Sequence, residues 1–180
     1  MISKFIETRA SEILSEMKIR LAPINVEKIA KKLGLTVMEF DLGSNVSGVL
    51  YIQNGKGTIG FNPKESPVRR RFTIAHEIGH FVLHKLNNDM FVDTKEFKLF
   101  RNENSSTGEN KMEMEANAFA AALLMPKDLL ISEIKNHNFD FTEEGENDPI
   151  SNLSKKFEVS VTAMTYRIDN LNLFTRQKSI

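Results

Sequence analysis

The chain has 180 residues, with 24 basic and 24 acidic side chains and no cysteine. This length suits one domain, or one domain with a small addition, that buries a full core. A net charge of zero gives no reason to expect general affinity for nucleic acid or for anionic membranes. Because cysteine is absent, disulfides and thiolate metal sites are excluded, and any metal site must use histidine and carboxylate ligands.

The N-terminal residues and the apolar runs bear on localisation. The chain starts Met-Ile-Ser-Lys-Phe-Ile-Glu-Thr-Arg, with scattered charges and without the apolar centre of a signal peptide. No apolar run approaches the ~20 residues that are needed to span a bilayer. We therefore expect a cytoplasmic protein.

Two helices are expected at the start of the chain. Apolar residues at helical spacing predict an amphipathic helix over residues 3–21, and Pro23 breaks this pattern. Asn25 is placed to cap a short helix over 26–33. Gly34 is placed to end it.

Strands and a long helix are expected next. Strand-like stretches occur at 35–40, 46–52 and 57–61. The pair Asn54-Gly55 predicts a tight turn between the last two stretches. Ser66 and Pro67 then resemble the cap and the first position of a helix that continues to about Leu86.

The second half of the chain is predicted to be mainly helical. Residues 87–111 suggest a long loop with short strands near the active site. An alanine-rich helix is expected over 111–125, and Pro126 starts the next one. The acidic segment 137–149 resembles a turn, and two short helices are expected at 150–157 and 161–171.

The most informative pattern is His76-Glu77-Ile78-Gly79-His80. On a helix, the two histidines lie one turn apart on the same face, where both imidazoles can bind a single zinc ion. Glu77 is then placed to deprotonate a water molecule at that ion. Two unliganded histidines could share this spacing by chance, but the long amphipathic helix and the matching glutamate favour metal ligation.

Gly79 supports this interpretation indirectly. A glycine inside a helix costs ~1 kcal/mol relative to alanine, and close approach of another backbone could offset that cost. The alanine-rich segment 116–122 is a suitable neighbour.

A catalytic zinc ion needs a third protein ligand. His84 lies one turn beyond His80, but its Cα atom is ~12 Å from that of His76 along a helix. We therefore expect His84 to lie around the site or at the surface, and not to bind the same ion.

A carboxylate from the alanine-rich helix is the better candidate. Glu113 and Glu115 flank its predicted apolar stripe on opposite sides, so periodicity does not choose between them. Asn117 lies one turn after Glu113 and can orient a ligating carboxylate or an adjacent histidine. We favour Glu113 on this argument, with Glu115 as the alternative.

Two longer blocks carry a resemblance to a known family. They are Arg-Arg-Phe-Thr-Ile-Ala-His-Glu-Ile-Gly-His-Phe-Val-Leu-His at 70–84 and Glu-Met-Glu-Ala-Asn-Ala-Phe-Ala-Ala-Ala-Leu-Leu-Met-Pro at 113–126. Together they resemble the ImmA/IrrE family of zinc metallopeptidases, and weaker similarity extends over residues 23–175. The resemblance implies that His76, His80 and Glu113 bind zinc and that Glu77 is the catalytic glutamate.

The resemblance and the predicted elements together suggest an α+β fold. We expect a mostly helical, zincin-like metallopeptidase domain with a small antiparallel sheet packed on the zinc helix. Residues 1–22 would form an N-terminal helix and 23–136 the metallopeptidase domain. Residues 137–180 would form a C-terminal helical pair packed on the same domain.

Such a site would hydrolyse peptide bonds. Zinc lowers the pKa of a bound water toward ~7, and Glu77 would take its proton and pass it to the leaving amine. Tyr51, Tyr166, Arg71 and backbone amides are candidates for stabilising the developing charge on the carbonyl oxygen. The same two histidines and glutamate could also hold Mn²⁺ or Fe²⁺.

The expected substrate follows from the resemblance. Family members cleave helix-turn-helix repressors, so we expect this chain to cut a repressor encoded nearby and to induce genes of a mobile element, a toxin–antitoxin pair or a stress response. The alternative is a non-cleaving, metal-binding anti-repressor that acts by protein–protein binding, because an intact motif does not prove turnover.

The two C-terminal helices resemble a helix-turn-helix pair. However, the second of them carries a single cation, Arg167, and the whole chain is neutral. We therefore expect these helices to pack on the core or to contact a protein, without direct binding of nucleic acid.

Overall fold

The structure is a computed structural model that describes residues 4–86, 89–94, 108–137 and 148–173. It divides into two units. Unit 1 joins Met1–Ile24 to Ala121–Ile180, and unit 2 is Asn25–Ala120. The predicted loop at 87–111 and the predicted acidic segment at 137–149 lie largely outside the described residues.

Unit 2 contains a four-stranded sheet in the order β1-β3-β2-β4, formed by β1 (Thr36–Glu39), β2 (Val46–Gln53), β3 (Lys56–Phe61) and β4 (Met90–Thr94). The first three strands were predicted. β2 and β3 form a hairpin at Asn54-Gly55, where both residues have positive φ, +50° and +74°. Positive φ at both central residues is what a type I′ hairpin turn requires.

The predicted α+β fold with a small sheet is confirmed, but the sheet is mixed where an antiparallel one was expected. β2 is antiparallel to β3 and to β4, but β1 pairs with β3 in parallel. The reason is that β1 does not pair with β2, its neighbour in sequence. Instead, β3 lies between β1 and β2. Because β3 runs opposite to β2, it runs in the same direction as β1.

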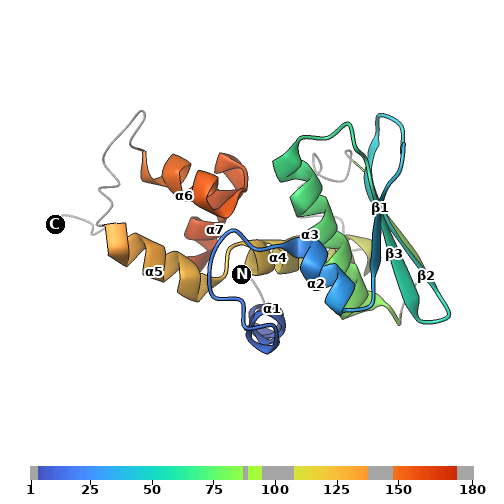
Figure 1. Ribbon diagram of the computed structural model, residues 1–180, viewed down its shortest axis with the longest axis horizontal. Coiled ribbons are helices and arrows are strands. Elements are labelled where there is room, and N and C mark those ends of the chain that lie inside the picture. The colour runs from blue at the N-terminus through green and yellow to red at the C-terminus, as the bar shows by residue number, and fades with distance from the viewer. Residues whose placement is uncertain (1–3, 87–88, 95–107, 138–147, 174–180) are drawn as a thin grey trace. The chain divides into compact units, whose positions relative to one another are not determined.

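Helix α3 (Pro67–His84) lies against one face of the sheet (Figure 1). It begins as predicted, with the Ser66 hydroxyl accepting a hydrogen bond from the Arg69 amide at 3.4 Å. It ends two residues earlier than expected. Leu86, which was expected at the end of the helix, is therefore beyond it and 93% exposed.

Helix α2 (Val26–Lys32) also packs on α3. Its predicted cap is confirmed, because the Asn25 side chain accepts a hydrogen bond from the Lys28 amide at 2.9 Å. Gly34 follows the helix with φ of +80°, a conformation that favours glycine after a helix end.

Most of helix α4 (Gly108–Leu124) also belongs to unit 2, where it packs against α3. A Cβ atom added to Gly79 on α3 would lie 3.2 Å from both the Cα and the carbonyl oxygen of Ala116 on α4. The predicted close approach of the alanine-rich helix to Gly79 is thus confirmed. It is this approach that lets short side chains on the two helices meet.

Unit 1 contains α1 (Lys4–Glu16), the end of α4, α5 (Lys127–His137), α6 (Pro149–Phe157) and α7 (Val161–Leu171). The prediction that the first helix extends to residue 21 is wrong. Lys18 has φ of +55°, and the amides of Lys18 and Ile19 bond to the carbonyls of Ser15 and Leu14. This bonding pattern ends a helix. It was not predicted because lysine stands at the position that usually holds glycine.

Arg167 on α7 is 1% exposed and connects distant parts of unit 1. Its Nε donates a hydrogen bond to the Met125 carbonyl at 2.9 Å, and its two terminal nitrogens pair with the Glu7 carboxylate on α1. The single cation of α7 is therefore engaged inside the unit, so this helix presents no exposed cation.

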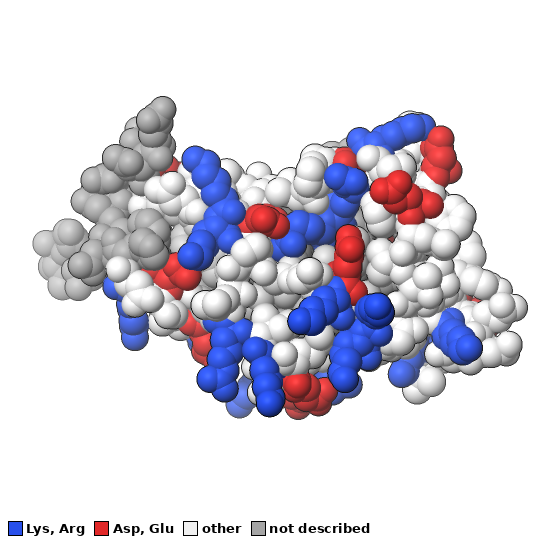
Figure 2. All heavy atoms as spheres, in the orientation of Figure 1, with Lys and Arg blue, Asp and Glu red and all other residues white. Residues whose placement is uncertain are grey.

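Two surface properties concern possible partners. On the face that Figure 2 shows, acidic and basic side chains are intermingled among uncharged ones. Among the described helices, none combines the length and the apolar character needed to cross a bilayer.

Candidate metal centre

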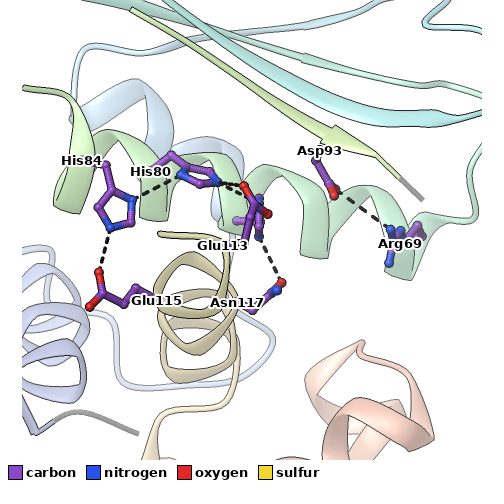
Figure 3. Close-up of polar contacts among 8 residues, drawn as sticks. Arg69, His80, His84, Asp93, Glu113, Glu115 and Asn117 are labelled. Atoms are coloured by element: carbon purple, nitrogen blue, oxygen red, sulfur yellow. Dashed lines mark hydrogen bonds and ion pairs between the residues drawn. The ribbon is translucent and has the colours of Figure 1, made fainter. Parts of the chain in front are cut away.

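Three of the predicted site residues converge in unit 2, with the histidines on α3 and Glu113 on α4 (Figure 3). The Nε2 atoms of His76 and His80 are 3.0 Å apart. The Glu113 carboxylate oxygens lie 3.3 Å from the Nε2 of His76 and 3.0 Å from that of His80. Both histidines are buried, and the glutamate side chain is 20% exposed.

This triangle has the dimensions of one face of a tetrahedral zinc site. Zinc binds nitrogen and oxygen at about 2.0–2.2 Å, which separates neighbouring ligand atoms by roughly 3.3–3.6 Å. The distances of 3.0–3.3 Å between the two Nε2 atoms, and from each of them to its nearer Glu113 oxygen, are close to that value. Two imidazoles and one carboxylate are also the donor types that zinc prefers. The residues therefore fit the metal that the sequence pattern suggests.

The hydrogen bond of His76 to Asn117 on α4 leaves the right nitrogen free for a metal. His76 Nδ1 lies 3.1 Å from the Asn117 side-chain oxygen, which only accepts hydrogen bonds. The proton of a neutral His76 therefore sits on Nδ1, and its Nε2 carries the lone pair. The structure thus places Asn117 where the sequence suggested an orienting residue.

Glu77 lies beside this triangle as a fully buried carboxylate. Neither of its oxygens has a hydrogen-bond partner among the described residues. Burial raises the pKa of Glu77 to about 8, and the charges of Asp93 and Glu113 add to this, although His76 opposes it. Leaving a buried carboxylate without a donor costs free energy, so the arrangement fits a group that meets a water molecule or a substrate.

The charges at the triangle are strongly coupled. Burial lowers the pKa of His76, but its hydrogen bond to Glu113 and the surrounding carboxylates outweigh burial and raise the pKa to about 9. Burial raises the pKa of Glu113, but its hydrogen bonds to both histidines outweigh this and lower it to about 2. Burial lowers the pKa of His80, and the charge on His76 adds to that effect. Without metal, the surrounding carboxylates therefore favour a proton on His76 over one on His80.

The other predicted residues take different places. His84 is buried, but it lies on the far side of His80, and Glu115 contacts His84 at 3.0 Å instead of reaching the triangle. Tyr51 is 46% exposed, on the strand face opposite to buried Leu50. Tyr166 belongs to unit 1 and is 50% exposed.

Strand β4 contributes two residues that sequence reasoning missed. Asp93 is 2% exposed, and one of its oxygens lies within 4.8 Å of ligand atoms of His76 and Glu77. Its carboxylate is also 4.0 Å from the guanidinium of Arg69 at the start of α3 (Figure 3). The ring of Phe91 stacks on the His80 ring, with centroids 4.5 Å apart and planes inclined by 22°. The alternation of β4 places both residues on one face, a signal that could have found them.

Comparisons with known proteins show the family and the fold of the chain. A family model described as Peptidase_M78, IrrE N-terminal-like domain, matches residues 30–169. "Uncharacterized immunity region protein 2" of Bacillus phage phi105 is 31% identical over 115 residues, which make up 64% of this chain and 66% of the phage protein.

A solved structure of a Mycobacterium tuberculosis transcriptional regulator is also similar. It aligns with a TM-score of 0.64 and 18% identity over 99% of this chain. This likeness shows a shared fold. The alignment covers 50% of the mycobacterial chain, so this chain spans less than two thirds of the length of either relative.

Proposed function

Because the chain belongs to the Peptidase_M78 family of IrrE N-terminal-like domains, we propose that it is a zinc-dependent endopeptidase that cuts a partner protein at a specific site. One observation carries the proposal. His76, His80 and Glu113 converge within 3.0–3.3 Å of one another, beside the buried carboxylate of Glu77. Two helices from different parts of the chain build this arrangement, and its donor atoms match those of hydrolytic zinc sites.

The proposed reaction divides the work between metal and protein. When bound, zinc would supply Lewis acidity, which polarises a carbonyl and makes water more acidic. Glu77 accepts the proton of the attacking water and delivers it to the leaving amine. Its carboxylate suits this role because no donor among the described residues engages it. Mn²⁺ and Fe²⁺ also bind such ligands, so the metal must be identified by elemental analysis of the purified protein.

The proposed substrate is a helix-turn-helix repressor encoded beside this chain. The resemblance to ImmA/IrrE peptidases suggests this class of target. The name of the phage relative, an immunity region protein, supports a search among regulators. Cleavage would relieve repression and so induce the genes that the repressor controls.

Co-expression with the product of the adjacent reading frame tests the proposal. The wild-type chain should cut that product. Glu77→Gln should retain bound metal but abolish cleavage, because the amide cannot accept a proton from water. Glu39→Gln, at an exposed position on β1, removes the same charge away from the site and serves as the control.

The contrary outcomes are distinct. Undiminished cleavage by Glu77→Gln would rule out the peptidase mechanism. A tight complex in which the wild-type chain leaves its partner intact would instead favour the anti-repressor that acts by binding alone. Measuring complex formation and cleavage in the same samples separates the two.

A further inference from the structure

His84 and Glu115 are not among the proposed ligands, yet they form a chain of hydrogen bonds that ends on the proposed ligand His80. His80 Nδ1, on the far side of its ring from the triangle, is 3.2 Å from His84 Nδ1. His84 Nε2 is in turn 3.0 Å from a carboxylate oxygen of Glu115 (Figure 3). His84 is 4% exposed and the Glu115 side chain is 34% exposed. The line therefore runs from a half-buried carboxylate to the buried centre.

The donors and acceptors in this line can be ordered in only one way while both rings are neutral. An ionised Glu115 only accepts hydrogen bonds, so the proton of His84 lies on Nε2. The Nδ1 of His84 then carries a lone pair and accepts a hydrogen bond from His80 Nδ1. This leaves the lone pair of His80 on Nε2, the atom that faces His76 and Glu113.

The two proposed histidine ligands are therefore supported differently. His76 donates to the neutral amide of Asn117 in one step. His80 donates to a second imidazole, which ends on a negative charge. Both supports end on α4, the helix that also provides Glu113. The stacking of Phe91 on the face of His80 leaves the ring plane fixed, so the hydrogen bond at its edge determines which nitrogen points inward.

We propose that His84 and Glu115 act as a relay that positions His80 and strengthens metal binding. His84 and Glu115 are positioning residues, since neither reaches the triangle. Glu115 acts on the metal through two imidazoles and makes His80 a more basic ligand, as carboxylates behind zinc-binding histidines do. This inference rests on the proposed metal centre but not on peptide cleavage.

Paired substitutions of His84 test the relay through zinc affinity. His84→Leu removes both hydrogen bonds, and we expect zinc to bind about 10- to 100-fold more weakly. His84→Gln can accept from His80 through its oxygen and donate to Glu115 through its nitrogen, so it should recover most of that loss. The zinc dissociation constant is measured by competition with a chromophoric chelator, and thermal unfolding of the metal-free proteins shows that each variant folds.

Glu115 provides a second test because it is partly exposed and tolerant of replacement. Glu115→Leu should weaken zinc binding about tenfold in the wild-type background. In the His84→Leu background the same change should have no effect, because the relay is already broken. Lys111→Met, which removes the exposed cation 3.8 Å from Glu115, is the control on the same helix and should change affinity less than twofold.

Three results would overturn the relay. The first is a zinc dissociation constant within twofold of wild type for both His84→Leu and Glu115→Leu. The second is an equal effect of Glu115→Leu in both backgrounds, which would mean that its charge acts through space. The third is a wild-type chain that binds no zinc, which would end the proposed metal centre as well. Undiminished cleavage by Glu77→Gln would instead rule out the peptidase mechanism and leave the relay in place, because the relay is measured by zinc affinity alone.

Discussion

Room for the Glu77 carboxylate depends on a residue without a side chain. A Cβ atom added to Gly48 on β2 would lie 2.3 Å from the Thr73 methyl group and 3.0 Å from a carboxylate oxygen of Glu77. The first distance is far below van der Waals contact, so a side chain at this position must shift Thr73, α3 or the strand. Glycine here is explained by the close packing of β2 on the face of α3 that carries Thr73 and Glu77.

Gly48→Ala should therefore affect both stability and activity. Overpacking of a buried contact costs about 1–3 kcal/mol of unfolding free energy, and displacement of Glu77 should reduce the cleavage rate. Denaturant unfolding and a cleavage assay measure the two effects. Gly108→Ala adds the same methyl group where no atom of the described residues lies within 4 Å, and it should leave both quantities near wild type. A Gly48→Ala variant that matches this control would show that the strand yields easily.

At the scale of helices and strands, the centre depends on the separation of α3 from α4. The histidines come from one helix and Glu113 from the other, and the two backbones approach at Gly79 and Ala116. Helix propensity alone would make Gly79→Ala stabilising by ~1 kcal/mol. The new methyl group would, however, lie 3.2 Å from backbone atoms of Ala116, which cannot rotate away as a side chain can.

We therefore expect Gly79→Ala to push the helices apart and to weaken the zinc site. The Glu113 carboxylate would recede from both imidazoles, so the zinc dissociation constant should rise, by about tenfold if the shift is a few tenths of an ångström. Competition with a chelator measures this change. An affinity equal to that of the Gly108→Ala control, together with a gain in stability, would show that propensity outweighs the contact.

How far the sequence predicts these elements depends on whether the signal is local. The caps at Asn25 and Ser66 and the turn at Asn54-Gly55 are correctly predicted, because each depends on a few adjacent residues. The parallel pairing of β1 is not predicted, and for β4 the sequence predicts only short strands somewhere within 87–111. Both pairings depend on partners distant in sequence.

The same distinction applies to the site. The spacing of His76 and His80 is a local helical signal, and it predicted that the two rings would meet. The contacts of Phe91 and Asp93 were missed because β4 is short and pairs with β2, about 40 residues earlier. The roles of the site residues and the predicted domain ranges 1–22, 23–136 and 137–180 stay predictions.

For the whole molecule, the charges at the triangle make stability depend on pH when no metal is bound. The pKa of His76 rises from 6.5 to about 9 on folding, and that of Glu77 rises from 4.5 to about 8. A group whose pKa is raised holds its proton longer in the folded state, so it loses its contribution to stability as pH rises between the two values.

The unfolding free energy of the metal-free protein should therefore fall as pH rises from about 6.5 to about 9. Zinc should reverse this trend, because it binds deprotonated ligands and stabilises the folded state more as protons leave. Denaturant unfolding at several pH values, with a chelator or with excess zinc, measures both slopes. A metal-free protein whose stability is constant or rises across this window would contradict the prediction.

The ion pair of Glu7 with Arg167 has a consequence for the order in which the protein is made. These residues are 160 positions apart, so α1 leaves the ribosome long before its partner on α7 exists. Unit 2, in contrast, is one continuous stretch, Asn25–Ala120, and it contains every residue of the proposed metal centre. Because domains fold as units during synthesis, this stretch can fold and bind the proposed metal before α7 has been made and before Glu7 can pair with Arg167.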